Sequence, residues 1–427
     1  MAVYSEADQT APYVLEADQA IAIGAAPAAD SYLNIEAILE AARTSGAEAI
    51  HPGYGFLSEN PTFAEACGRA GVTWVGPPVE AMRAMADKVE ARRIVSAAGV
   101  PVVPGSDGPV GAADALAVAR EVGFPVMVKA ARGGGGIGMT VAADEAALEA
   151  ALATAAARAG AAFGDASVFL ERRVEGPRHV EVQVLGDASG HVIHLFEREC
   201  SVQRRHQKVV EETPSMALDD DTRAELCAAA VRAAEAVGYQ SAGTVEFIYG
   251  RTSEDAPPSF HFLEMNTRLQ VEHPITEETT GVDLGAAMLR VAAGEPTGIG
   301  EVSRHGHAIE FRIYAEDPVR FLPSPGLIET WEEPHGEGIR VDSGVAAGYR
   351  VTHFYDPLLA KLVVSAADRA TAIARSIAAL QSFTVVGVKH NIPAHLEVLN
   401  SPEFISGAYD TGLLGAIAER RRAALSQ

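Results

Sequence analysis

The sequence predicts a protein of three domains that combines α/β and α+β architecture. The chain has 427 residues, and at about 150 residues per domain this length suggests three domains. In the first eighty residues, short apolar runs alternate with helical patterns, which is typical of a parallel α/β sheet. Farther along, strand patterns come in runs with helices between them, which indicates an α+β arrangement.

The first domain is expected to end near residue 84. Apolar runs predict strands at 2–5, 20–24, 47–53 and 72–77. Between them, NIEAILEAARTSG at 34–46 has the pattern of a helix, and a second helix precedes the last strand.

The second domain is expected over 85–303, with the turn-rich segment 294–300 as a linker at its end. It opens with a helix at 85–98, and further helices are predicted at 142–162 and 222–237. Its strands are predicted at 124–130, 167–174, 179–187, 191–199, 243–250 and 260–268.

The third domain, over 304–427, is predicted to be mostly β. Its strands are expected at 308–316, 326–333, 338–345 and 358–366, followed by a helix at 369–381.

Composition excludes several classes of protein. The net charge of −23 lacks the basic footprint of a protein that coats nucleic acid or an anionic membrane. Three distant cysteines without a Cys-x-x-Cys pair suit a reducing compartment better than a disulfide framework or a zinc cluster. The N-terminus has no signal-peptide layout, and charged residues interrupt the longest apolar stretch. We therefore expect a cytoplasmic protein.

The strongest single motif is Lys129 at the end of an apolar run, followed by RGGGGIG at 132–138. Successive glycines let backbone N–H groups close on an anion, and a lysine at a strand end adds a charge for phosphate. The motif is neither a P-loop nor a Rossmann fingerprint, because the glycine spacing differs and no Gly-Lys-Ser/Thr follows. A flexible loop is the structural alternative.

A second motif is EMNTRLQVEHP at 264–274. Its polar residues alternate, so on an extended chain they would share one side. Upstream, Glu246 lies in an apolar strand; if that strand pairs with 260–265, Glu246 and Glu264 come close. Two carboxylates and the Asn266 amide oxygen are ligands that Mg²⁺ prefers. A solvated edge strand would produce the same alternation.

A third motif is basic. Within the five positions 204–208 of a strongly acidic chain lie Arg204, Arg205, His206 and Lys208. This local cluster favours a binding site for small anions over a solvated loop. Two weaker signals are His179, in an alternating strand, and Arg340, in the segment GIRVDS. Either residue taken alone would be interpreted as having a structural role.

Together these residues resemble the biotin carboxylase family of ATP-grasp enzymes. Five segments carry the resemblance in the right order: HPGYGFLSEN at 51–60, Lys129 with its glycine run, CSVQRRHQK at 200–208, EMNTRLQVEHP at 264–274 and FLPSPG at 321–326. The resemblance implies an N-terminal Rossmann-like (pre-ATP-grasp) domain, an ATP-grasp domain with a mobile lid at about 101–176, and a C-terminal biotin carboxylase domain. Family members carry a further strand–turn–helix unit before the segment that corresponds to residue 1.

The resemblance also implies roles for single residues. ATP phosphates would be held by Lys88, Lys129, His206 and the glycines Gly133, Gly134, Gly135 and Gly136. Adenine would rest against Glu171, Arg172 and Val174, with His179 and Gln203 near the ribose. Mg²⁺ or Mn²⁺ would be bound by Glu246, Glu264 and Asn266. Bicarbonate would contact Lys208, Arg268, Gln270, Val271 and Glu272. Biotin would lie near Arg340, Tyr54 and Gly55. Catalytic roles would fall to Glu272, Arg268, Arg340 and Lys208.

The implied activity is ATP-dependent carboxylation of biotin by bicarbonate, the first half-reaction of an acyl-CoA carboxylase. The implied partners are a biotin carboxyl carrier protein, a carboxyltransferase and a second copy of the chain. Two alternatives compete: another ATP-grasp ligase, such as a carbamoyl-phosphate or amino-acid ligase, and an inactive nucleotide-binding homologue. An inactive homologue would be expected to lack at least one of Lys208, Glu246, Glu264, Arg268 or Glu272, and all five are present.

Overall fold

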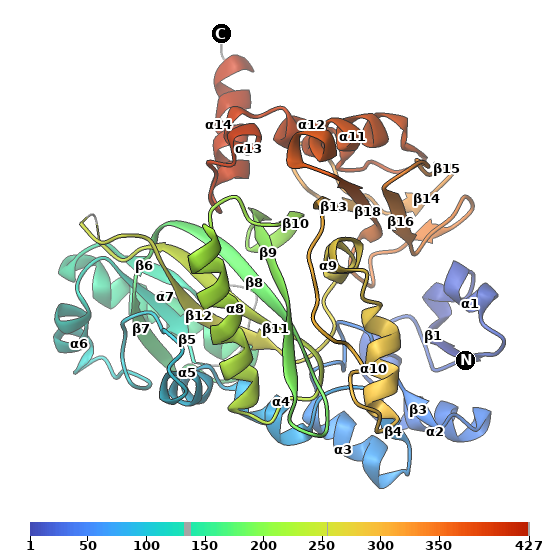
Figure 1. Ribbon diagram of the computed structural model, residues 1–427, viewed down its shortest axis with the longest axis horizontal. Helices are drawn as coiled ribbons and strands as arrows, with labels where there is room; N and C mark the ends of the chain where they lie inside the picture. Colours follow the sequence, from blue (N-terminus) through green and yellow to red (C-terminus); the bar gives the residue numbers. More distant parts are fainter. Residues whose placement is uncertain (132–137, 254, 426–427) are drawn as a thin grey trace.

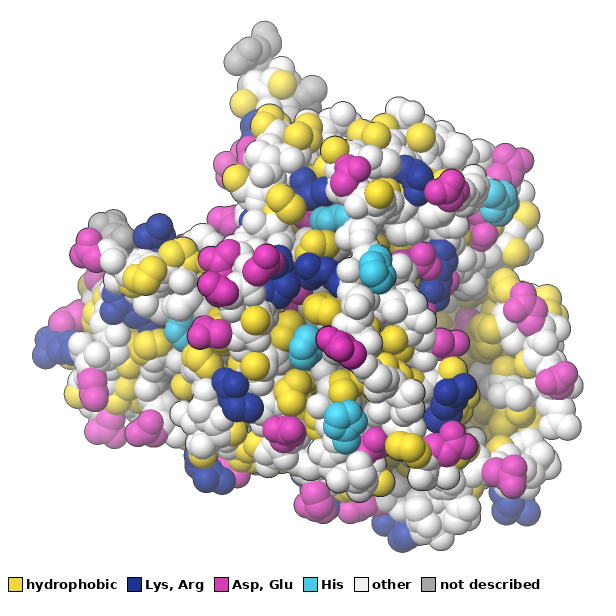
Figure 2. All heavy atoms as spheres, in the orientation of Figure 1, with side chains coloured by type: hydrophobic (Ala, Val, Ile, Leu, Met, Phe, Trp, Pro, Cys, Tyr) yellow, Lys and Arg dark blue, Asp and Glu magenta, His cyan; other side chains and the backbone are white. Residues whose placement is uncertain are grey.

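The computed structural model describes residues 1–131, 138–253 and 255–425. The predicted phosphate-binding glycines at 133–136 lie outside these described residues. Figure 1 shows a broad central sheet, with the N-terminal segment along its lower edge and the C-terminal helices at the top. No helix in the described ranges is long and apolar enough to cross a membrane. On the face drawn in Figure 2, acidic and basic side chains are interspersed.

The N-terminal segment alternates strands and helices as predicted. β1 (Ala2–Tyr4) pairs in parallel with β2 (Ala20–Ala22), and β3 (Ala49–Ile50) pairs in parallel with β4 (Thr73–Trp74). The four strands form two separate pairs rather than one sheet. The helices of this segment are α1 (Pro12–Glu16), α2 (Ile35–Ser45) and α3 (Pro61–Arg69). Asn34 and Asn60 cap α2 and α3 by accepting backbone N–H bonds, as the sequence pattern favours.

The helix predicted at 85–98 is in fact two helices, α4 (Val79–Ala86) and α5 (Lys88–Ala97). The break occurs at Asp87, whose backbone is extended and whose side chain accepts bonds from the N–H groups of Val89 and Glu90. Asp87 therefore starts a new helix instead of continuing the old one. Lys88 consequently occupies the first position of α5.

Residues of the predicted lid form a small layer with its own core. β5 (Val126–Ala130) pairs antiparallel with β6 (Thr140–Ala142) on one side and β7 (Val168–Arg172) on the other. The helices α6 (Ala115–Val122) and α7 (Glu145–Phe163) supply the alanine and leucine side chains that pack on these strands. Lys129 and Glu171 belong to β5 and β7.

The central sheet has the order β12-β11-β8-β9-β10-β13-β18-β16, with antiparallel neighbours throughout. Its strands are β8 (Glu175–Gly186), β9 (Val192–Arg204), β10 (Gln207–Thr213), β11 (Ser241–Arg251), β12 (Ser259–Asn266), β13 (His307–Tyr314), β16 (Ile339–Ser343) and β18 (Leu358–Ala366). Because β10 pairs with β13, one sheet continues across the domain boundary predicted at 303.

Helices cover both faces of this sheet. α8 (Asp220–Glu235) packs on β8 and β9, as Figure 1 shows. On the other side, α9 (His273–Thr280) packs on β9, β10, β13 and β18, while α10 (Leu284–Ala292) packs on β11.

The C-terminal part contains the predicted strands and more helix than the sequence analysis identified. The strand expected at 326–333 is two short strands, β14 (Gly326–Leu327) and β15 (Thr330–Glu332). They separate because β14 pairs with β17 (Arg350–Val351) and β15 with β19 (Thr384–Val386). The predicted helix at 369–381 is α11 (Arg369–Ser382), and α12 (Ile392–Leu399), α13 (Pro402–Ser406) and α14 (Leu413–Leu425) follow it.

Candidate active site

A cavity of about 780 Å³ lies where α4, α5, the β5–β7 layer and the central sheet meet. Of the predicted site residues, those that line it are Lys88, Lys129, Glu171, Arg172, Val174, His179, Gln203, His206, Lys208, Glu246, Glu264, Asn266, Arg268, Gln270, Val271 and Glu272. The structure thus brings together the residues expected to bind ATP, metal and bicarbonate. Tyr54, Gly55 and Arg340 do not line this cavity.

The alternation of β8 and β11 produces the polar wall of the cavity. In β8, Val180 and Val182 belong to the hydrophobic core that α8 covers, whereas His179 projects to the opposite, cavity face. In β11, Val245 packs in the same core and Glu246 lines the cavity. A two-residue period in each strand therefore separates a valine-rich face from a polar face that lines the cavity.

A tight hairpin places the basic motif at this wall. Arg205 and His206 connect β9 to β10, with φ angles of 50° and 68°. Positive φ at both central residues is the geometry of a type I′ hairpin turn, which matches the twist of the flanking strands. His206 and Lys208 therefore reach the cavity together.

Lys208 is surrounded by carboxylates. Its Nζ donates to Glu181, to Glu246 Oε1 at 2.8 Å and to Glu272 Oε1 at 2.7 Å. Burial alone would lower the pKa of Lys208, but these carboxylates outweigh burial and raise the pKa well above its ordinary value. Lys208 is therefore held as a cation, with each of its three donors directed at a carboxylate.

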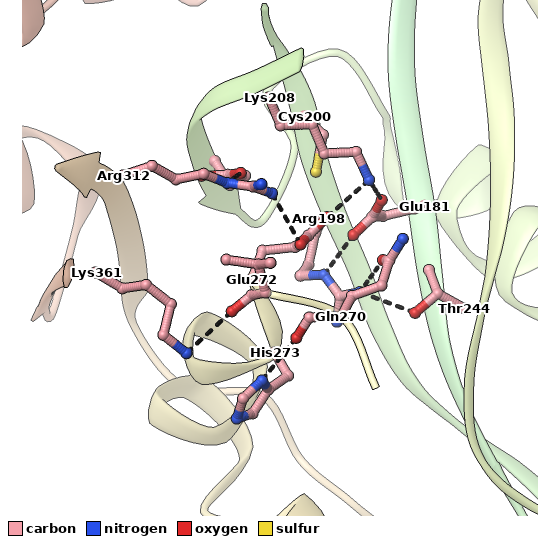
Figure 3. Close-up of polar contacts among 12 residues, drawn as sticks. Glu181, Arg198, Cys200, Lys208, Thr244, Gln270, Glu272, His273, Arg312 and Lys361 are labelled. Carbon is pink, nitrogen blue, oxygen red and sulfur yellow. Dashed lines mark hydrogen bonds and ion pairs between the residues drawn. The ribbon is translucent and has the colours of Figure 1, made fainter. Parts of the chain in front are cut away.

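Glu272 is the residue immediately before α9 and is only 1% exposed. It accepts from Lys208 through one oxygen and from Arg312 Nη2 at 3.0 Å through the other, as Figure 3 shows. Burial would raise the pKa of Glu272, but Lys208 and Arg312 outweigh it and lower the pKa well below the ordinary range. Glu272 is thus an ionised carboxylate between two cations.

The predicted metal ligands are neighbours. Glu246 and Glu264 lie directly opposite each other across β11 and β12, as predicted. Glu246 Oε1 accepts from Asn266 Nδ2 at 2.9 Å, and its Oε2 lies 3.0 Å from His179 Nε2. Glu264 lies 3.0 Å from Lys88 Nζ. The two carboxylates fit a hard divalent cation, and the Asn266 side chain lies beside them with its Nδ2 toward Glu246 and its Oδ1 toward Arg268.

The extended chain expected over 264–272 is wrong beyond its first residues, because β12 ends at Asn266 and a loop follows. The alternate residues still gather, but through hydrogen bonds rather than strand geometry. Arg268 donates to Asn266 Oδ1 at 3.1 Å and to Glu59 Oε2 at 3.0 Å. Gln270 Nε2 donates to Glu246 Oε1 at 2.9 Å. The loop folds back onto the carboxylate wall.

The opposite wall of the cavity carries Lys129 and Glu171, two of the residues predicted for ATP. Glu171 is 4% exposed and forms ion pairs with both Lys129 and Arg92. On the wall formed by the central sheet, Gln203 Nε2 lies 3.1 Å from His179 Nδ1 and donates to the carbonyl of Cys200 at 2.9 Å. Glu171 therefore holds Lys129 in place from the β7 side.

Arg340, on β16, lies outside the cavity, against α9. It forms a two-pronged pair with Asp342, at 2.8 and 3.0 Å, and donates to Glu277 Oε2 at 2.9 Å. Asp342 also lies 3.2 Å from Lys361 Nζ, which donates to the backbone oxygen of Val271 at 3.1 Å. Lys361 thereby links the Arg340 pair to the loop that carries Glu272.

Several residues of the site were not identified from the sequence: Glu181, Arg198, Arg312 and Lys361. Each is a charged residue inside a buried strand, and that signal was available in the sequence. What the sequence did not contain was the partner of each charge.

Glu310 on β13 is an unusual buried acid close to this site. It is 0% exposed, and neither of its oxygens has a hydrogen-bond partner among the described residues. Across the strands it faces Glu211, whose own pKa is raised to about 7 by burial. Burial and Glu211 raise the pKa of Glu310 well above its ordinary value, although Lys361 and Arg312 oppose them. Burial therefore favours the protonated form of Glu310 over its carboxylate.

This protonation state predicts how stability depends on pH. Because the pKa of Glu310 is raised on folding, the folded chain holds this proton to a higher pH than the unfolded chain does, so this group lowers stability as pH rises above the unfolded pKa. Glu310→Gln removes that effect. We expect the variant to gain stability relative to the parent protein as pH rises above the ordinary glutamate pKa of about 4.3, measured by urea unfolding. A difference that does not change with pH would show that Glu310 is ionised.

Comparisons with known proteins agree with this geometry. Three family models match consecutive segments: "Biotin carboxylase, N-terminal domain" at residues 1–82, "Carbamoyl-phosphate synthase L chain, ATP binding domain" at 87–299, and "Biotin carboxylase C-terminal domain" at 310–416. The middle model takes its name from another ATP-using enzyme, whereas the two flanking models are those of biotin carboxylases.

Whole-chain relatives are similar over nearly their full length. The chain is 50% identical over 419 residues to a biotin carboxylase of Halalkalibacterium halodurans, covering 97% of this chain and 91% of that protein. A Campylobacter jejuni biotin carboxylase solved as a β,γ-ATP complex matches with a TM-score of 0.93 and 46% identity, over 97% and 92% of the two chains. The biotin carboxylase domain dimer of Hydrogenobacter thermophilus 2-oxoglutarate carboxylase, solved with MgADP, ADP and bicarbonate, matches with a TM-score of 0.92 and 44% identity, over 97% and 91%.

Proposed function

Because this chain belongs to the biotin carboxylase family, we propose that it carboxylates biotin with bicarbonate and ATP. One observation carries the proposal: a single cavity joins Lys88 and Lys129 on one wall to the Lys208–Glu272 pair on the other. Neither alternative, another ATP-grasp ligase or an inactive homologue, gains support from the comparisons.

ATP would occupy the part of the cavity between the β5–β7 layer and the sheet. Lys88 and Lys129 supply positive charge for the phosphates, His206 lies beside them as a further polar contact, and Glu171, Arg172 and Val174 form the wall for adenine. His179 and Gln203 would lie near the ribose. Glu246, Glu264 and Asn266 would hold Mg²⁺ or Mn²⁺. When bound, such a cation offsets negative charge on the transferred phosphoryl group.

Bicarbonate would bind beside Lys208, Arg268, Gln270, Val271 and Glu272. Glu272 takes the bicarbonate proton, and the freed oxygen attacks the γ-phosphorus of ATP, so that ADP leaves and carboxyphosphate forms. Carboxyphosphate breaks down to CO₂ and phosphate, and the phosphate takes the N–H proton of biotin. The biotin enolate then attacks CO₂, with Arg340 offsetting the enolate charge near Tyr54 and Gly55.

The partners follow from this chemistry. Biotin would arrive on a carrier protein, and a carboxyltransferase would pass the carboxyl group to an acyl-CoA, with acetyl-CoA or propionyl-CoA as the expected acceptor. The Hydrogenobacter thermophilus relative is a domain dimer of a larger carboxylase, which supports a second copy of this chain as a further partner. We place the protein in the cytoplasm.

The proposal is tested by measuring ADP release by the purified chain. We expect ATP hydrolysis that requires bicarbonate, increases with free biotin and is abolished by EDTA, because each ligand completes the constellation described above. Re-addition of Mg²⁺ should restore it. A rate of ATP hydrolysis that changed with neither bicarbonate nor biotin would instead indicate a different ATP-dependent ligase.

A further inference from the structure

Arg198, in the middle of β9, is a fully buried guanidinium with 0% exposure. Each of its five N–H groups has a partner, and Figure 3 shows it at the centre of a cluster with Glu181, Gln270 and Glu272. The acceptors are Glu181 Oε1 at 2.6 Å, Gln183 Oε1 at 2.7 Å, Thr276 Oγ1 at 3.1 Å, Thr244 Oγ1 at 3.0 Å and Gln270 Oε1 at 3.0 Å.

Stability alone does not account for such a residue. Removing a guanidinium from water is costly, and well-packed apolar side chains often replace buried ion pairs without loss of stability. A guanidinium differs from an apolar group in that its fork of donors fixes the direction of several acceptors at once. The acceptors of Arg198 lie on β8, β11, α9 and the loop before α9, so Arg198 joins the elements that build the site.

The first connection runs through Glu181, the cross-strand neighbour of Arg198. One oxygen of Glu181 accepts from Arg198, and the other accepts from Lys208. Lys208 in turn donates to Glu272. By taking one side of the Glu181 carboxylate, Arg198 limits how strongly Glu181 draws Lys208 away from Glu272.

The second connection runs through Gln270. Because Gln270 Oε1 accepts from Arg198, its Nε2 must point the other way, and it donates to Glu246 Oε1 at 2.9 Å. The third connection is Thr276, in the first turns of the helix that begins directly after Glu272. Arg198 thus orients an amide and holds the helix start that positions Glu272.

We propose that Arg198 is a positioning residue for the bicarbonate site: it sets Lys208, Gln270 and Glu272 relative to one another without touching substrate. This inference rests on the proposed function. ATP is expected to bind mainly on the Lys88 and Lys129 wall, which Arg198 does not contact. Loss of Arg198 should therefore impair the use of bicarbonate far more than the binding of ATP.

The test compares Arg198→Lys and Arg198→Met with the parent chain, measuring kcat/KM for bicarbonate, KM for MgATP and melting temperature. We expect Arg198→Met to lower kcat/KM for bicarbonate by about 100-fold, the scale of a misplaced catalytic group, with KM for MgATP changed by less than about threefold. Arg198→Lys keeps a positive charge beside Glu181 but lacks the planar set of guanidinium donors. Its kcat/KM for bicarbonate should therefore lie between those of Arg198→Met and the parent chain.

The matched control is Arg223→Met. Arg223 on α8 pairs with Glu197, the neighbour of Arg198 on β9, at 2.7 Å, and it does not line the cavity. The Arg223→Met variant should have a lower melting temperature than the parent chain and an unchanged kcat/KM for bicarbonate.

The inference is overturned if Arg198→Lys keeps the parent kcat/KM for bicarbonate. This outcome can be measured even if Arg198→Met does not fold. Equal losses for bicarbonate and MgATP would also overturn it, because they would indicate a purely structural arginine. A parent chain without bicarbonate-dependent hydrolysis would instead refute the proposed function itself.

Discussion

Replacing Glu272 with glutamine is expected to lower kcat by about 10²- to 10⁴-fold, the usual contribution of a general base. The carboxylate lies between Lys208 and Arg312 and is ionised, because both cations lower its pKa. Glutamine keeps the shape of the side chain but cannot accept the bicarbonate proton. Affinity for MgATP should change little, because Lys88 and Lys129 lie on the other wall. Steady-state ADP release and equilibrium binding of MgATP measure the two effects.

A closely matched control exists in the same sheet. Glu212 is also 1% exposed and also has two basic partners, His307 and Arg369, each at 2.7 Å. It does not line the cavity. Glu212→Gln should therefore reduce stability while leaving kcat unchanged. If Glu272→Gln retained full turnover, Glu272 would not be the base, and another group would have to take the bicarbonate proton.

Replacing Arg340 with glutamine is expected to separate the two halves of the reaction. Arg340 does not line the cavity, so hydrolysis of ATP with bicarbonate alone should stay within about twofold. Biotin carboxylation should fall by about 10²- to 10³-fold, the usual effect of removing one donor to a developing oxyanion. Incorporation of labelled bicarbonate into free biotin, measured beside ADP release, reports both activities.

Two further variants sharpen this experiment. Arg340→Lys keeps the charge but cannot form the two-pronged pair with Asp342, so a partial loss is expected. Arg350→Gln, which changes an exposed arginine of the same part of the chain, should affect neither activity. An Arg340→Gln variant in which both activities fell equally would place Arg340 in the phosphoryl-transfer step instead.

The candidate residues that the sequence identified are those whose chemistry is unusual where they occur. Lys129 closes an apolar strand before a glycine run, and Glu246 interrupts an apolar strand. Burying a charge is costly without a partner, so each position indicated a site before any contact was known. Arg198 and Arg312 carry the same signal, but their partners lie on other strands, and strand register is set by packing that a single sequence does not display.

The loop after Asn266 shows that the backbone path, too, could not be predicted from the sequence alone. Alternation predicted an extended chain, and its side chains do converge, but through bonds from Arg268 and Gln270 to side chains of the wall. Residue type was therefore a better guide than local geometry at this point. Tertiary hydrogen bonds to Glu246 and Glu59 decided the backbone path.

The sequence by itself determined the helix that begins near Asn34, the alternating strand that holds His179, and the types of side chain that line the cavity. These depend on neighbours within a few residues, where short-range sterics and hydrogen bonding decide the outcome. Only the tertiary structure decided that β13 pairs with β10, which carries Arg312 across the predicted domain boundary to Glu272. The reason is physical: the charge state of Glu272 depends on cations within a few ångströms, and folding brings those cations from distant parts of the chain.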